Sequence, residues 1–95
     1  MYSFKEVDPT KEYNHTEIWD YVYERDNCLC QMCGGTKLLQ QHHIISRGKG
    51  GGTHTNNLIL MCYDCHIGKA FTKKITENLL SKAIKNEIKF RERMV

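Results

Sequence analysis

The sequence predicts an α+β domain in which two short strands lie between helices and are tied together by cysteines. Two Cys-x-x-Cys pairs stand 28 residues apart, which exceeds the spacing of a simple zinc ribbon and leaves room for an inserted element. Two short runs of strand character lie between the pairs, separated by a loop that holds four glycines. Helical patterns precede the first pair and follow the second.

The inserted element is expected to be strand, loop and strand. Residues 38–45 end in a β-branched pair and suit a strand, while residues 57–61 form a second, almost wholly apolar run. The glycines of residues 46–56 argue against regular structure between them. The chain after the second strand, residues 62–71, is expected to be helical.

A helix is expected before the first cysteine pair. Asn14 and Glu17 have the spacing of a capping box, which predicts a helix over about residues 15–27. Residues 1–13 contain the one proline and are expected to be an extended N-terminal lead. The apolar stripe of the predicted helix comprises Ile18, Trp19 and Val22.

A second flanking helix is expected at the C-terminal end. Thr76 is predicted to cap it, and the helix is predicted to run over about residues 77–94. Its apolar residues recur at i, i+4 and i+8, which predicts that one face is buried. These residues are Leu80, Ile84 and Ile88.

Length and charge limit what the chain can do. Its 95 residues are expected to form one domain, 1–95, with a marginal hydrophobic core unless a metal adds stability. The formal charge of +3 is unevenly spread, with a net −4 over residues 1–27 and +5 over residues 69–95. A basic C-terminal part is typical of a surface that faces phosphates, and a solvated helix surface explains it equally well.

The start of the chain carries no apolar core of a signal peptide, and no run approaches 18 consecutive apolar residues. These features predict a cytoplasmic protein without a membrane segment. Disulfides are rare in such a reducing compartment, so metal binding is the better interpretation of the cysteines.

The two cysteine pairs predict a structural zinc site. Each pair offers two thiolates at the spacing that one side of a tetrahedral Zn²⁺ requires, and the two pairs complete a four-cysteine set. The predicted ligands are Cys30, Cys33, Cys62 and Cys65. Cys28 is expected to be a free, buried thiol.

The histidines are not equivalent in this arrangement. His42 and His43 end the first strand, and His66 directly follows Cys65 at the start of a helix. The zinc would hold that helix so that His42 lies across from His66, which makes half of a second metal site. Because neighbouring strand residues point to opposite faces, His43 is expected to lie beside the metal as a general base. His15 and His54 are expected to be exposed and have no assigned role.

In this order, the motifs resemble the HNH (ββα-metal) endonuclease family. The resemblance covers about residues 25–70. It is carried by Arg25-Asp26-Asn27, Cys30-Gln-Met-Cys33-Gly34, His42-His43-Ile44-Ile45, the Gly50-Gly51-Gly52 loop, Asn57-Leu58 and Leu60-Met-Cys62-Tyr-Asp-Cys65-His66. It implies a ββα-metal core with a four-cysteine zinc knot, flanked by the N- and C-terminal helices.

The resemblance also implies an activity, which is metal-dependent hydrolysis of phosphodiester bonds in DNA. His42 and His66 would hold the catalytic Mg²⁺, Mn²⁺ or Ni²⁺, His43 would be the general base, and Asn57 would brace the loop. Many relatives carry a further histidine one helical turn on, where this chain has Lys69 and Ala70. Two protein ligands suffice if water and phosphate oxygens complete the coordination.

Two basic residues of the glycine loop, Arg47 and Lys49, could grip phosphates, and mobile surface charges are an equal interpretation. The alternative function is a non-catalytic zinc module that binds DNA or protein. A zinc deaminase fits poorly, since no proline precedes either cysteine pair. A small chain of this kind resembles those carried by phages, which suggests a phage packaging or other nuclease partner. No motif indicates an oligomeric state.

Overall fold

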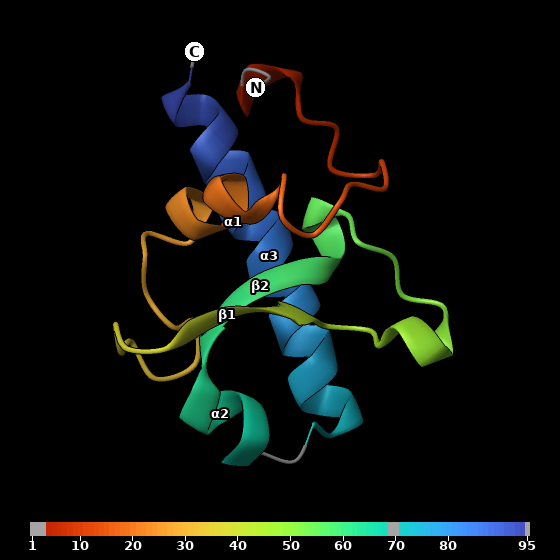
Figure 1. Ribbon diagram of the computed structural model, residues 1–95, viewed down its shortest axis with the longest axis vertical. Coiled ribbons are helices and arrows are strands. Elements are labelled where there is room, and N and C mark those ends of the chain that lie inside the picture. The colour runs from red at the N-terminus through yellow and green to blue at the C-terminus, as the bar shows by residue number, and fades with distance from the viewer. Residues whose placement is uncertain (1–3, 69–70, 95) are drawn as a thin grey trace.

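The computed structural model describes residues 4–68 and 71–94 and confirms the α+β class. Figure 1 shows α3 running the length of the molecule behind the two strands, with α1 on one side of the strands and α2 on the other. The helices and strands are α1 (Trp19–Arg25), β1 (Leu39–His43), β2 (Leu58–Cys62), α2 (Tyr63–Gly68) and α3 (Lys73–Arg93). Short 3-10 turns lie at η1 (Phe4–Glu6), η2 (Arg47–Lys49) and η3 (Thr55–Asn57).

The two strands form an antiparallel pair in which Leu39 lies opposite Cys62 and His43 opposite Leu58. Every residue of β2 is buried, because helices cover both of its faces. In β1 the alternation of side chains places Gln40 and His42 on one face and Gln41 and His43 on the other. This alternation places the side chains of His42 and His43 on opposite faces of β1.

Two hydrophobic clusters hold the helices on the strands. The first cluster joins Ile59 and Met61 of β2 to Leu79 and Ala83 of α3, next to the cysteines. The second joins Leu58 to α1 and to the far end of α3, where Phe90 meets Tyr21. β2 therefore contributes to both clusters and is the central element of the fold.

Helix α1 is shorter than predicted. One half of the predicted capping box forms, since the Asn14 N–H donates to Glu17 Oε1 at 2.8 Å; in place of the other half, Asn14 Oδ1 accepts from the Thr16 N–H at 2.9 Å and not from Glu17. These two bonds cap a turn that precedes α1, which itself begins at Trp19. Positive φ angles at Asn27 and Cys28 prevent it from continuing.

The predicted register of α3 is wrong. The helix is capped by Thr72, whose side chain accepts the Ile75 N–H, and not by Thr76. Ile84 and Ile88, expected on the buried face, are 46% and 55% exposed. The buried residues are Leu79, Ala83, Glu87 and Phe90. Glu87 faces inward because it meets buried polar partners, which a pattern of apolar residues does not reveal.

Those partners form a buried ionic network around Arg25, whose side chain is fully covered. Arg25 pairs with Asp26 at 2.9 Å and with Glu87 at 3.4 Å. It also donates to the carbonyls of Thr55 at 2.6 Å and Leu58 at 2.5 Å. Burial opposes the charge of the guanidinium, but Asp26 and Glu87 outweigh it and raise the pKa of Arg25. The network ties α1 and α3 to the start of β2.

Within the described residues, no helix has the length and apolar character needed to cross a membrane.

Candidate metal centres and catalytic site

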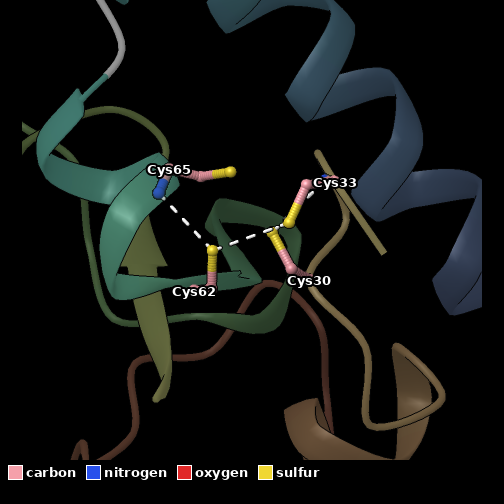
Figure 2. A group of neighbouring side chains, drawn as sticks. All are labelled: Cys30, Cys33, Cys62 and Cys65. Carbon is pink, nitrogen blue, oxygen red and sulfur yellow. Dashed lines mark hydrogen bonds between the residues drawn. The ribbon is translucent and has the colours of Figure 1, made fainter. Parts of the chain in front are cut away.

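The four predicted zinc ligands form one cluster. Their sulfur atoms all lie within 4.8 Å of one another, and Cys33 Sγ lies 3.7 Å from Cys62 Sγ. Figure 2 shows Cys62 and Cys65, from the junction of β2 and α2, facing Cys30 and Cys33 across the cluster. Four sulfurs at about 2.3 Å from a tetrahedral Zn²⁺ would lie about 3.8 Å apart. The cluster therefore fits structural zinc.

Backbone N–H groups surround the sulfurs. Cys30 Sγ accepts from Met32 at 3.4 Å and from Cys33 at 3.5 Å, and Cys62 Sγ accepts from the Cys65 N–H at 3.4 Å. Burial alone raises the pKa of Cys30, but N–H donors lower it to about 6. Donors of this kind favour the thiolate that a metal requires. Cys28 is half-buried and lies outside the cluster.

The structure brings His42 and His66 together. Their ring centroids are 5.0 Å apart with the ring planes at 67°, and Phe71 stacks on the His42 ring at 4.6 Å. His42 Nε2 is buried and has no hydrogen-bond partner in the described part of the chain. A buried nitrogen without a partner is costly, and a metal ion at this point would satisfy it.

The hydrogen bonding and burial of the two rings suit metal binding. His66 Nδ1 lies 2.8 Å from Gln40 Oε1, and since this oxygen only accepts, Nδ1 is the donor and Nε2 is the nitrogen left for a metal. Burial, with help from His66 and His43, lowers the pKa of His42 to about 4, so its ring is neutral at pH 7. His42 is therefore in the neutral form that binds a divalent metal, and His66 Nε2 is the ring nitrogen that does not contact Gln40.

His43 lies on the other face of β1. Its ring stacks on His15 with centroids 6.2 Å apart, and its Nε2 lies 2.9 Å from Thr53 Oγ1. Burial is the main cause that lowers its pKa, and Arg47 and His15 lower it further. An open depression nonetheless joins His43 to His42 and His66. Its lining comprises Gln41, His42, His43, Ser46, Arg47 and His66.

Asn57 closes the loop that follows β1. Its side-chain oxygen accepts the Ile45 N–H at 2.9 Å, and its Nδ2 donates to the carbonyls of Ile45 and Gly52, each at 3.0 Å. Gly51 passes so close that a Cβ there would lie 1.8 Å from the Ile45 oxygen, so only glycine fits. The amide thus holds both ends of the loop that carries Arg47 and Lys49.

The two basic residues of this loop lie at the rim of the site. Arg47 lines the depression beside the three histidines, and its Nη1 donates to Thr53 Oγ1 at 2.5 Å. Lys49 lines an adjoining depression together with His42 and His43. Both residues are exposed, so both are accessible to a phosphate.

Several residues of the site were not singled out from the sequence. Gln40 stands two positions before His42, so strand periodicity alone could have placed it on the same face. His15 was expected to have no role, but its ring covers His43, and His54 Nδ1 is buried rather than exposed. No sequence pattern pointed to Thr53, because it lies in an irregular loop. Lys69 and Ala70, at the position of the third histidine of many relatives, lie outside the described residues.

Comparisons with known proteins agree with this geometry. Residues 30–71 match the HNH endonuclease family. Over 66 residues, the chain is 26% identical to the type IV methyl-directed restriction enzyme EcoKMcrA of Escherichia coli strain K12, covering 60% of this chain and 24% of that protein. The matched segment contains all four clustered cysteines as well as His42, His43, Asn57 and His66.

A solved structure shares the fold. The type IV phosphorothioation-dependent restriction endonuclease ScoMcrA aligns with a TM-score of 0.57 and 24% identity, over 72% of this chain. The chain spans only 16% of that structure and about a quarter of the E. coli enzyme. Residues 30–71 are thus similar to the HNH endonuclease family, and the solved structure shows that the fold is shared. Neither relative supports the expected phage source.

Proposed function

We propose that this chain is an HNH endonuclease that hydrolyses phosphodiester bonds of DNA, with a divalent metal on His42 and His66 and with His43 as general base. The observation that carries the proposal is the pair of facing imidazoles, 5.0 Å apart, one of which has a buried nitrogen without a partner in the described residues. The relatives are restriction enzymes, which favours DNA as the substrate.

The proposal assigns each group a separate task. A bound Mg²⁺, Mn²⁺ or Ni²⁺ would supply positive charge for the phosphate and the departing 3′ oxygen. The rings of His42 and His66 would hold that ion, while His43 takes the proton of the attacking water. Arg47 and Lys49 contact phosphates at the rim. The products are a 5′-phosphate and a 3′-hydroxyl.

The four-cysteine cluster has a different role in this proposal, which is to hold a structural Zn²⁺. The cysteines flank β1 and β2 in the sequence, so their metal fixes α2, and with it His66, against the hairpin. The proposal takes residues 1–95 as a single nuclease domain. It is supported by the packing of α1 and α3 on the same strand that ends at Cys62.

Replacement of His43 tests the enzyme assignment. We expect His43→Ala to lower the rate at which supercoiled plasmid is nicked by about 10²- to 10⁴-fold, the usual contribution of a general base. Nicking is measured on gels with Mg²⁺, Mn²⁺ or Ni²⁺. Ile88→Ala, which truncates an exposed side chain on α3, is purified in parallel as the matched control.

The folded state of each variant is checked by its zinc content and melting temperature. Equal nicking by wild type and His43→Ala would remove His43 from its assigned role. A wild-type protein that binds DNA but leaves every plasmid intact with all three metals would favour the alternative, a non-catalytic zinc module.

A further inference from the structure

Thr53 lies at the point where the general base, the loop and the N-terminal lead meet. The residue is 2% exposed, although it belongs to an irregular part of the loop. Its hydroxyl oxygen lies 2.9 Å from His43 Nε2 and also receives a hydrogen bond from Arg47 Nη1 at 2.5 Å. A buried hydroxyl with two such partners has a defined place in the site.

We propose that Thr53 is the positioning residue of His43, and that it fixes the ring with its hydrogen on Nε2. This inference rests on the proposed function, because a base needs a lone pair on one nitrogen and a hydrogen on the other. A hydroxyl oxygen has two lone pairs and can accept from Arg47 and from His43 Nε2–H together. Nδ1 of His43 is then the nitrogen that takes the proton from water.

The backbone of Thr53 is held on both sides by the N-terminal lead. The Thr53 N–H donates to Glu12 Oε1, and the Tyr13 N–H donates to the Thr53 carbonyl, each at 2.8 Å. Because its backbone is held in this way, the Thr53 hydroxyl keeps a fixed position relative to the His43 ring. A positioning group must itself be rigid, and these two bonds supply that rigidity.

His15, just after this lead, also covers the His43 ring. Gln41, on the same face of β1, donates to the His15 carbonyl at 3.0 Å, and the His15 ring stacks on His43 at an angle of 14°. Residues 12–15 lie outside the segment that matches the HNH family. The base is therefore held by its own loop on one side and by residues 12–15 on the other.

The chain offers a matched pair of threonines for the test. Thr53→Val removes the hydroxyl and keeps the shape, and Thr53→Ser restores the hydroxyl. Thr55→Val is the control, since Thr55 is also buried but its hydroxyl has no hydrogen-bond partner in the described residues. We expect Thr53→Val to lower kcat for plasmid nicking by about 10- to 100-fold with little change in KM, and Thr53→Ser and Thr55→Val to stay near wild type.

A readout besides activity comes from nitrogen-15 NMR of the imidazole rings, with His43 assigned by the signals lost in His43→Ala. We expect hydrogen on Nε2 of His43 in the wild type and a mixture of tautomers in Thr53→Val. A wild-type ring with hydrogen on Nδ1, or equal kcat in Thr53→Val and Thr55→Val, would overturn the inference. If Thr53→Val does not fold, the wild-type spectrum and the Thr53→Ser rate still decide it.

The two proposals fail in different ways. A wild-type protein that nicks no DNA but shows hydrogen on Nε2 would sink the nuclease assignment and support the hydrogen bond from His43 to Thr53. A protein that nicks DNA through His43 but carries hydrogen on Nδ1 would keep the nuclease and sink the role of Thr53.

Discussion

Removal of the proposed zinc is expected to unfold this chain. Structural zinc contributes on the order of 10 kcal/mol to the folding of small zinc peptides, and whole domains have a net stability of about 5–15 kcal/mol. The cysteines also belong to one of the two hydrophobic clusters, together with Ile59 and Met61 of β2. Loss of the metal therefore leaves four thiols crowded within 4.8 Å and loosens the strand that both clusters share.

The measurement is far-ultraviolet circular dichroism during titration with a strong chelator, with zinc measured in the same samples. We expect helical signal and zinc to be lost together and to return together when Zn²⁺ is added. Cys62→Ser should behave as the chelated protein does. Cys28→Ser is the matched control, because Cys28 lies outside the cluster, and it should keep about one zinc per chain. A zinc-free protein that melts like the native one would contradict the prediction.

The four-cysteine cluster could be predicted from the sequence because the spacing within each pair is local. A Cys-x-x-Cys pair forms its own side of a site, so only the meeting of two pairs is long-range. The facing of His42 and His66 follows from the meeting of the two pairs, because His42 lies next to the end of β1 and His66 directly follows Cys65. The side of β1 on which His43 lies follows from strand alternation alone.

The errors of the sequence interpretation also have a common cause. The buried face of α3 includes Glu87, which is stabilised by Arg25 from a helix 62 residues earlier. A pattern of apolar residues favours Ile84 and Ile88 for that face and has no means of detecting a buried ion pair. Thr53 escapes for a similar reason, since Glu12 and Tyr13, which hold it, are about 40 residues away.

The two ends of β2 are held by different chemistry. Cys62 ends the strand in the sulfur cluster, while the carbonyl of Leu58, at its start, accepts from Arg25. His42 and His43 lie on the partner strand opposite Ile59 and Leu58, near the Arg25 end. The hairpin would thus be fixed by the proposed zinc at one end, and it is held by a buried guanidinium at the other. A substitution that loosens either end of β2 is expected to displace His42 and His43.

The buried guanidinium gives the second large effect: Arg25→Ala is expected to lower the free energy of unfolding by about 3–5 kcal/mol, as when one partner of a buried ion pair is removed. Asp26 is fully buried, and among the described residues its carboxylate would keep the Leu60 N–H at 2.8 Å and Asn86 Nδ2 at 2.9 Å as partners. Glu87 would retain Arg91 and Tyr21. Urea denaturation of the zinc-loaded protein measures the loss.

Two variants distinguish this network from a general effect of charge. Lys74→Ala removes one positive charge from an exposed position of α3 and should change stability by less than about 0.5 kcal/mol. Arg25→Lys keeps the charge but not the planar guanidinium that reaches Asp26 and two carbonyls. Its free energy of unfolding should therefore be close to that of Arg25→Ala. A loss below 1 kcal/mol in Arg25→Ala would show that the network adds little. Because Thr55 and Leu58 flank Asn57, the folded fraction of Arg25→Ala should also nick DNA more slowly than wild type, through a loosened loop rather than a missing ligand.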